Sequence, residues 1–397
     1  MRSRRLLVAA FGDAGHAFPA IALARALRRR GHEVLVETWE QWREPVEAEG
    51  LRFTAAQEYK TFPPPAADSA DGASAADAAR ALVPLMEEFR PDVVVSDVLT
   101  VAPALAAEKA GRRRATLIPH VYPVHEPGMP FFAFGLQPPR TPIGRMGWRA
   151  GLPLLTAGLR RGRREMNEMR AAVGLAPVDR LHGGISAELA LVATFPQLEY
   201  PRRWPEGVRV TGPMEFELPY PDIGLPNGGA PLVLVAPSTA QDPELRLLGA
   251  SLEALAEEPV RVVATTNRRG AGGELPQMPP NAVVVDWLSY SQVMPQAALV
   301  VCHGGHGTVA RALGAGAPVL CCPAVGDMAE NSARAAWVGA GLMLPWRLTR
   351  PGPLRAATRR ILGDTRFAQR AAVIAAWARE HNGAQRGAEL VESLVAG

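Results

Sequence analysis

The sequence predicts an α/β protein made of two doubly wound, Rossmann-like domains, and three observations support this. Each half opens with an apolar run, at residues 6–11 and 232–236, that leads into a polar loop, as parallel strands followed by helices do. The 397 residues suffice for two domains of about 150–200 residues each. A Pro- and Gly-rich stretch, residues 219–230, separates the halves. We therefore expect a first domain at 1–215, a linker at 216–230, a second domain at 231–382 and a C-terminal helix at 383–397.

The composition is that of a soluble globular protein, with 48% hydrophobic and 21% charged residues. The 43 basic and 39 acidic side chains leave a net charge of +4. The arginine runs, such as residues 160–164, are not interleaved with aromatic residues, so we expect no nucleic-acid partner. No apolar stretch is long enough for a membrane span.

The first ten residues are basic and then apolar, as in a short signal peptide, but residues 6–11 fit better as the first strand of a sheet. Cys302, Cys321 and Cys322 all fall on apolar strands, which predicts buried thiols rather than disulfides or metal ligands. These observations favour a cytoplasmic protein.

His16 is the first candidate functional residue. The strand at 6–11, the loop at 12–19, a helix at 21–29 and a strand at 34–36 predict a βαβ unit without the Gly-x-Gly-x-x-Gly fingerprint of a dinucleotide site. His16 falls where the first strand gives way to the first helix, at the carboxyl edge of the sheet. A histidine there is either a hydrogen-bonding residue at the helix terminus or a catalytic base.

Asp97 ends a buried strand at 93–97, after a Pro- and Ala-rich surface loop at 63–76 and a helix at 78–89. It either caps the segment that begins at Val101 or orients His16 and stabilises its imidazolium.

The segment after the next strand, 115–119, is rich in Pro, Gly and Phe. Phe131, Phe132, Phe134 and Trp148 either line an apolar pocket or pack beneath a long loop. A helix at 149–173 and a strand at 190–194 complete the first half.

The second half begins with a strand at 232–236 that runs into Ser238 and Thr239, whose hydroxyls suit either a phosphate contact or a helix cap. Strands at 260–265 and 282–285 follow. Trp287 and Leu288 come next, and Trp287 either stacks on a nucleobase or belongs to the core. Helices are expected at 359–379 and 384–395.

A glycine-rich turn, His303-Gly304-Gly305-His306-Gly307-Thr308, links a buried strand at 298–302 to a helix at 309–313. Such a turn presents unpaired N–H groups at a helix N-terminus, where the helix dipole also favours an anion, so it suits a phosphate. The alternative is a tight turn in an ordinary doubly wound domain. After the next strand, 319–322, Asp327 offers a carboxylate that accepts hydrogen bonds from sugar hydroxyls. Both loops follow carboxyl ends of strands, where open α/β sheets bind ligands.

The stretch from His303 to Asn331 resembles the donor-binding signature of glycosyltransferase family 1, the GT-B enzymes that glycosylate small molecules, and most closely its bacterial antibiotic and natural-product members. In that pattern a histidine and small residues bind the diphosphate, and an Asp-Gln pair binds the hexose at the separation of His303 and Asp327. Met328 departs from the pattern, because the family usually has Gln there. Gly15-His16-x-x-Pro19 is similar to the family's Gly-His-x-x-Pro, whose histidine deprotonates the acceptor hydroxyl.

The resemblance implies a GT-B fold in which the first domain binds the acceptor, the second binds the nucleotide sugar, and the last helix crosses back to the first domain. It implies an inverting hexosyltransferase that uses a TDP- or UDP-sugar and no other cofactor. His16 would be the base and Asp97 its partner. The implied donor residues are Ser238, Thr239, His303, Gly305, Gly307 and Thr308 at the diphosphate, Trp287 and Leu288 at the nucleobase, and Asp327 and Met328 at the sugar. The acceptor, a hydroxylated small molecule, would meet Phe18, His120, Phe131, Phe132 and Phe134.

No metal is expected, since there is no Asp-x-Asp and no His/Cys/Asp/Glu cluster with ligand spacing. A nucleotide-sugar epimerase of similar fold would need a further carboxylate pair near the sugar, and a non-catalytic binder would need no base. The sequence leaves open whether the protein forms a homodimer.

Arg311 stands where family members that use uridine donors often place a glutamate that binds both ribose hydroxyls. Since arginine cannot accept a hydrogen bond, we expect TDP to bind at least as tightly as UDP, unless Arg311 points to solvent.

Overall fold

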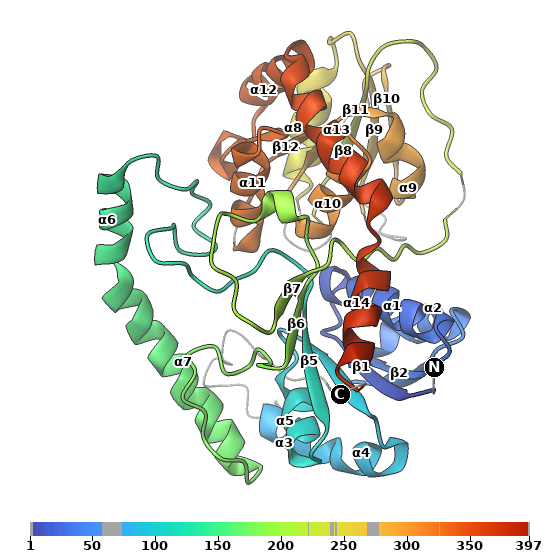
Figure 1. Cartoon of the computed structure of the whole chain (residues 1–397). Helices are drawn as coiled ribbons and strands as arrows, with labels where there is room; N and C mark the ends of the chain where they lie inside the picture. Colours follow the sequence, from blue (N-terminus) through green and yellow to red (C-terminus); the bar gives the residue numbers. More distant parts are fainter. Residues whose placement is uncertain are drawn as a thin grey trace.

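The computed structural model describes residues 3–57, 74–220, 222–238, 242, 244–267, 278–324 and 326–395, and these contain two parallel sheets (Figure 1). The first sheet has seven strands in the order β3-β2-β1-β4-β5-β6-β7. Its strands are β1 (Arg5–Ala9), β2 (Glu33–Thr38), β3 (Arg52–Ala55), β4 (Val93–Asp97), β5 (Arg113–Ile118), β6 (Leu189–Val192) and β7 (Val208–Val210). Parallel neighbouring strands need crossover connections, most of which are helical here, and the alternation of strands and helices confirms the α/β prediction.

The second sheet has six strands in the order β10-β9-β8-β11-β12-β13, and all of its neighbours also pair in parallel. Its strands are β8 (Leu232–Ala236), β9 (Arg261–Thr265), β10 (Ala282–Val285), β11 (Ala297–Cys302), β12 (Val319–Cys321) and β13 (Gly341–Met343). The strand order of each sheet reverses once beside its first strand, between β1 and β4 and between β8 and β11. Ligand sites of open α/β sheets lie at such reversals.

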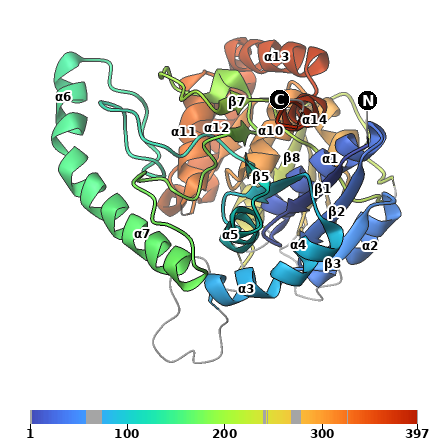
Figure 2. The same ribbon diagram turned by 60° about the horizontal axis from the view of Figure 1, so that its bottom comes forward.

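Helices cover both faces of the first sheet. The helices of this half are α1 (Ala14–Arg29), α2 (Arg43–Ala48), α3 (Ala75–Ala81), α4 (Val83–Phe89), α5 (Val101–Lys109), α6 (Pro142–Ala150) and α7 (Leu152–Ala172). Apolar residues of α1 pack with Leu6 and Val8 of β1, whereas α4 and α5 pack with Leu7, which points to the opposite face. In Figure 2, α6 and α7 form an arm along the edge of the molecule.

The second sheet is also covered on both faces. The helices of this half of the chain are α8 (Arg246–Leu255), α9 (Tyr290–Val293), α10 (His306–Gly314), α11 (Asp327–Trp337), α12 (Pro351–Gly363) and α13 (Thr365–Glu380), and the last helix, α14 (Gly383–Ser393), follows them. Helices α10, α11 and α13 pack on one face, and α8 and α12 on the other. Short 3₁₀ turns occur at Glu40–Trp42, Pro196–Leu198, Met294–Gln296 and Trp346–Leu348.

The last two helices link the halves. Helix α13 packs on α10 of the second sheet, and α14 packs on α1 and β6 of the first (Figure 1). Glu392 on α14 accepts hydrogen bonds from Arg30 at 2.7 Å and bonds the ring of buried His32 at 2.8 Å. The end of the chain is thereby fixed to the first sheet.

Three helices expected as single segments are interrupted. The helix at 78–89 is α3 and α4, with Pro84 in the first turn of α4, and the helix at 149–173 begins earlier and bends at Gly151 between α6 and α7. The helix at 359–379 is split at Asp364, whose side chain accepts a hydrogen bond from the N–H of Arg366. New helices start at these points because proline has no N–H that would need an acceptor, and a cap side chain accepts a hydrogen bond from an otherwise unpaired N–H. The predicted loop at 63–76 lies mostly outside the described residues.

Candidate active site

A cavity of about 320 Å³ lies where the carboxyl edges of the two sheets face each other. The loop after β1 and the start of α1 contribute Asp13 and His16 to its lining, and the loop after β11 and the start of α10 contribute His303 and Thr308. The points at which the strand order reverses in the two sheets therefore open onto one cavity.

His16 and Asp97 form a hydrogen-bonded pair at the first of these reversals. His16 Nδ1 lies 2.8 Å from Asp97 Oδ2. His16 is in the first turn of α1, after β1, and Asp97 ends β4, which is the strand beside β1. Asp97 Oδ1 accepts a hydrogen bond from Leu99 N at 2.9 Å, so both carboxylate oxygens are engaged. The carboxylate is fully buried, and the imidazole is 16% exposed and lines the cavity. Because the carboxylate can only accept, Nδ1 carries the proton and Nε2 is left with a lone pair.

The environment of His16 makes it a stronger base. Burial lowers the pKa of His16, but the charge of Asp97 and its hydrogen bond outweigh burial, with smaller contributions from Asp13 and Asp327, so that the pKa is raised above its ordinary value. His120 lies beside it, with ring centroids 6.1 Å apart, and burial and the neighbouring His16 lower the pKa of His120. His120 is therefore uncharged at neutral pH.

The glycine-rich turn has a geometry that only glycine fits. Gly304 has φ of +86°, and a Cβ there would lie 2.8 Å from the backbone oxygen of Met328. A Cβ on Gly305 would collide with the His303 ring, so the ring lies directly over the backbone of the turn. His303 Nδ1 makes a long hydrogen bond, 3.5 Å, with the carbonyl of Ala236, and burial lowers the pKa of His303.

The N-terminus of α10 faces the cavity with uncapped donors. Gly305 is the N-cap residue and offers no side chain to the first turn, while Gly305, Gly307 and Thr308 all line the cavity. Ser238, after β8, lines it from the neighbouring strand. Unsatisfied N–H groups beside a hydroxyl are suited to an anion. Thr239 lies outside the described residues.

Asp327 and Met328 line the cavity from the start of α11. Asn331, one turn later, donates from Nδ2 to Asp327 Oδ2 at 3.3 Å and to the carbonyl of Gly304 at 3.2 Å. The carboxylate and the glycine-rich turn are thus held by one side chain. The charge of Asp327 also helps to raise the pKa of His16, whereas at His303 it only partly offsets the lowering by burial.

A further wall of the cavity includes Trp287 and Leu288, but sequence reasoning missed most of its polar members. Glu217, in the segment expected to be a linker, accepts hydrogen bonds from Tyr290 N at 2.5 Å and Ser289 Oγ at 2.9 Å. Arg311 donates to Glu217 at 3.3 Å and to the carbonyl of Phe216. Arg311 therefore lines the cavity, with its charge neutralised, rather than pointing to solvent.

Asn267 and His306 also line the cavity without having been expected there. Asn267 donates to the Tyr290 hydroxyl at 3.1 Å. His306 is buried, its Nε2 has no hydrogen-bond partner among the described residues, and burial lowers its pKa to about 3. The only sequence signal for it was a second histidine in the glycine-rich turn.

The predicted acceptor residues separate into two groups. Phe18 and His120 line the cavity, but Phe131, Phe132 and Phe134 do not. Phe131 packs edge-on against Trp148 of α6 and against Phe134, with ring centroids 5.2 and 5.7 Å apart. The loop folds back onto α6, so these rings pack on one another and on Trp148 and do not line the cavity. The ring of Phe132 packs behind that of His120, which does line the cavity, with the two ring centroids 5.9 Å apart.

Within the described ranges, no group of three or more His, Cys, Asp or Glu side chains could hold a metal ion. None of the helices in that part of the chain is both long and apolar enough to cross a bilayer.

Comparisons with known proteins agree with this geometry. Residues 250–396 match the model of the family described as Erythromycin biosynthesis protein CIII-like, C-terminal domain, and residues 20–188 match Glycosyltransferase Family 4. The chain is 30% identical to 4'-demethylrebeccamycin synthase of Lentzea aerocolonigenes, over 98% of this chain and 99% of that protein. It is 28% identical to O-mycaminosyltylonolide 6-deoxyallosyltransferase of Streptomyces fradiae, over 98% and 97%.

The glycosyltransferase VinC, solved in complex with DTDP, superposes on the chain with a TM-score of 0.71 at 20% identity, covering 99% of this chain and 100% of VinC. This likeness establishes the GT-B arrangement of the two sheets. With a matching relative over its whole length, the chain belongs to glycosyltransferase family 1, among the Erythromycin biosynthesis protein CIII-like enzymes related to antibiotic biosynthesis.

Proposed function

We propose that this glycosyltransferase moves a hexose from a TDP- or UDP-sugar to a hydroxyl of an apolar or aromatic natural product, with inversion at the anomeric carbon and without a metal ion. The observation that carries the proposal is the His16–Asp97 pair, which opens onto the same cavity as the N-terminus of α10 and Asp327. A binding protein has no need for an oriented base.

His16 is the base in this mechanism. Its Nε2 accepts the proton of the acceptor hydroxyl while the acceptor oxygen forms its bond to the anomeric carbon. Asp97, held on Nδ1 at 2.8 Å, stabilises the imidazolium that results. His120 stays neutral beside it and adds no competing charge.

The leaving group is the nucleoside diphosphate, which takes the electron pair of the breaking C–O bond. Charge that develops on it is stabilised by the uncapped N–H groups of Gly307 and Thr308 and by the Ser238 hydroxyl. Since the acceptor side and the diphosphate side lie on opposite sheets, a single displacement would invert the anomeric carbon. Donors of this kind neutralise a leaving diphosphate without a metal.

Asp327 is the proposed hexose contact. Asn331 leaves it fixed at the start of α11, from where it accepts hydrogen bonds from sugar hydroxyls. Met328 beside it supplies an apolar contact where a glutamine would bind another hydroxyl, which suits a sugar with fewer hydroxyl groups.

The wall of the cavity that includes Glu217 and Arg311 favours a donor whose nucleoside is a deoxyribonucleoside. Glu217 is the carboxylate nearest to Arg311, and Tyr290, Ser289 and Arg311 already occupy its oxygens. Little acceptor capacity remains for the 2′-hydroxyl of a uridine donor. The DTDP complex of VinC, a protein of the same fold, is consistent with thymidine donors in such a site.

Mass spectrometry of a donor panel against a mixed panel of phenols and macrolides tests the proposal. TDP- and UDP-hexoses should give acceptor masses increased by one hexosyl residue, that is, a hexose less one water, and NMR should show the anomeric configuration opposite to that of the donor. Release of a free, altered sugar without an acceptor product would assign the chain to the epimerases instead. Binding of donor without any turnover across the panel would argue for a non-catalytic binder.

A further inference from the structure

We propose that the arm formed by α6 and the first half of α7 docks the protein onto an anionic lipid surface. We call residues 140–164 the basic arm. This inference concerns a surface outside the cavity and does not rest on the proposed function.

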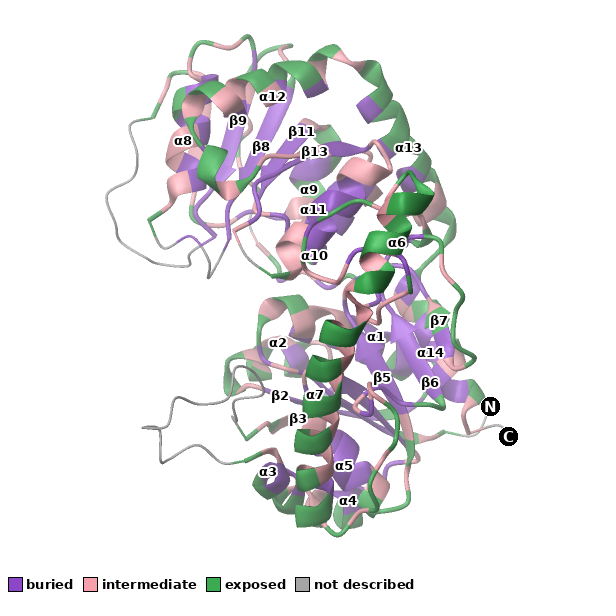
Figure 3. Cartoon of the chain, turned by 90° about the vertical axis from the view of Figure 1, so that its left-hand side faces the viewer, coloured by how far each residue is buried: buried purple, intermediate pink, exposed green. Residues whose placement is uncertain are grey.

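The basic arm is exposed along its length. Helix α6 has no buried residue, and Arg170, near the far end of α7, is the only buried residue of α7 (Figure 3). Amphipathic helices of globular proteins normally bury their apolar face. Nothing within the described residues covers this one.

The exposed face is apolar. Of nine large hydrophobic side chains that are exposed in the described part of the chain, five lie between residues 127 and 164. Three of them are on the basic arm: Ile143, Met146 and Leu154 are 76%, 64% and 79% exposed. With Ala150 they follow the helical spacing of one stripe, because Gly151 joins α6 to α7 in a helical conformation. Isolated exposed apolar residues are ordinary, but a stripe of them marks an interaction site.

The same segment is strongly positive. It carries seven arginines, and no Asp or Glu occurs between residues 127 and 164. Only two of the seven have polar partners among the described residues: Arg161 pairs with Glu165 at 3.0 Å and Arg163 donates to the carbonyl of Asp179 at 2.8 Å. The remaining five are Arg140, Arg145, Arg149, Arg160 and Arg164.

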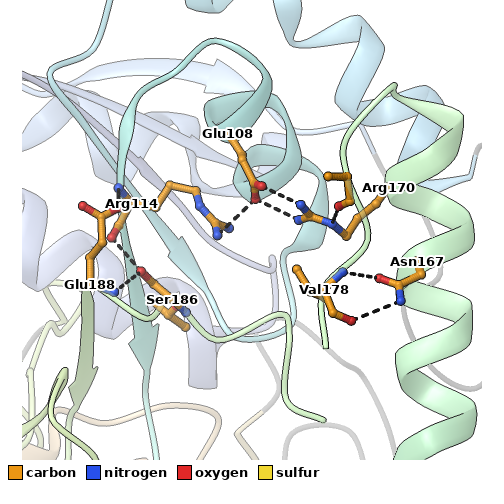
Figure 4. A network of polar contacts seen from close by, with 9 residues as sticks. Glu108, Arg114, Asn167, Arg170, Val178, Ser186 and Glu188 are labelled. Carbon is orange, nitrogen blue, oxygen red and sulfur yellow. Dashed lines mark hydrogen bonds and ion pairs between the residues drawn. The ribbon is translucent and has the colours of Figure 1, made fainter. Parts of the chain in front are cut away.

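The arm is anchored at its base. At its base, Arg170 donates two hydrogen bonds to Glu108 of α5, at 2.8 and 2.5 Å (Figure 4). Asn167 bonds both the N–H and the carbonyl of Val178, at 2.8 and 3.1 Å (Figure 4). The anchored end of α7 thus holds the exposed end in place.

An anionic bilayer surface matches both properties of the arm. Its headgroups supply the counter-charge for unpaired arginines, and its acyl boundary takes up the apolar stripe to a shallow depth, as for other interfacial helices. A second copy of the chain fits less well, because a two-fold contact would place one arginine-rich face against another.

Vesicle flotation with the full chain tests this proposal. The wild type should float with vesicles of phosphatidylcholine and phosphatidylglycerol in equal parts but not with phosphatidylcholine alone, and added salt should weaken binding. The double variants Ile143→Gln/Leu154→Gln and Arg160→Gln/Arg164→Gln should each bind at least about tenfold more weakly. Val373→Gln, which removes a 58%-exposed apolar side chain from α13, is the matched control and should bind like the wild type.

Thermal unfolding followed by circular dichroism should be unchanged in all variants, since the substituted side chains are exposed. The proposal is overturned if the wild type ignores anionic vesicles, or if the Ile143→Gln/Leu154→Gln variant binds them as well as the control does. If sedimentation shows a dimer that the Ile143→Gln/Leu154→Gln variant fails to form, the arm contacts a second copy and the proposal is overturned. Stoichiometric binding of a protein partner to the arm that anionic vesicles do not compete away would also overturn the proposal.

Discussion

Replacement of Asp97 by asparagine tests whether Asp97 orients and charges His16 as the proposed base. The amide keeps the size of the side chain but removes the negative charge 2.8 Å from His16 Nδ1. Its NH₂ group can donate to Nδ1, which would place the ring proton on Nε2 and leave no lone pair for the acceptor hydroxyl. A charged hydrogen bond of this kind contributes about 1.5–3 kcal/mol, or about ten- to a hundredfold in rate. With the unfavourable tautomer added, we expect kcat to fall by about 100- to 10,000-fold.

The pH profile provides a second readout of the same change. The raised pKa of His16 means that the base is protonated and inactive at low pH, so kcat/KM should rise with pH through a value above the ordinary pKa of histidine. In Asp97→Asn the charge no longer outweighs the lowering of the His16 pKa by burial. The rise of kcat/KM should therefore move to lower pH, and its value at high pH should fall. Asp13→Asn removes a charge that raises the pKa of His16 only from a distance, so the rise should shift less.

Initial rates from pH 5 to 9, measured by chromatography with saturating donor, provide the comparison. The nucleotide affinity of Asp97→Asn should match the wild type, since Asp97 lies on the other sheet from the glycine-rich turn. A kcat within about threefold of wild type, or an unmoved acid limb, would refute the role of the pair.

Three further predictions concern the donor half of the cavity. Asp327→Ala should weaken the intact nucleotide sugar far more than the free nucleoside diphosphate, and equal losses in calorimetry would contradict a hexose contact. TDP should bind at least as tightly as UDP because Glu217 is saturated beside Arg311, and a tenfold or greater uridine preference in competition binding would overturn that reasoning. Burial lowers the pKa of His303, whose Nδ1–H donates to the carbonyl of Ala236, so a bound diphosphate should favour the addition of a proton at Nε2. Calorimetry of TDP binding in buffers of different ionisation enthalpy should show proton uptake that is smaller in His303→Asn. Equal uptake by the two proteins would rule out protonation of His303.

Much of the fold follows from the sequence because parallel strands buried on both faces are continuous apolar runs. Residues 93–97 and 232–236 are entirely buried in β4 and β8, which is why their apolar patterns were informative. The helix interruptions at 82, 151 and 364 were missed, since apolar spacing continues across them. A single cap residue or proline decides such a break, and its effect depends on the packing around it.

The site could be anticipated where a residue follows a strand directly. His16 and Asp97 follow or end strands of the first sheet, and His303 and Asp327 follow strands of the second, so strand prediction placed each pair at one carboxyl edge. The resemblance to the family implied that the two edges face each other. Glu217 was not foreseeable, because the path of the connection between the sheets is set by its contacts with Ser289 and Tyr290.

The aromatic loop illustrates the limit of composition. Phenylalanines at 131, 132 and 134 suit a pocket lining and a self-packed cluster equally well by pattern. The outcome depends on whether α6 lies near enough for the phenylalanine rings to pack on it, and the contact of Phe131 with Trp148 shows that α6 does. No local signal in the sequence carries that information.

The most direct test of the account is a paired measurement on His16→Ala with an α-linked TDP-hexose and an accepted alcohol. The wild type should form only the β-linked glycoside, and His16→Ala should lose about 100- to 10,000-fold in kcat while binding TDP as tightly as the wild type. Such a result would separate the base on the first sheet from the donor site on the second. An α-linked product, or turnover by His16→Ala within about threefold of wild type, would contradict inverting transfer with His16 as the base.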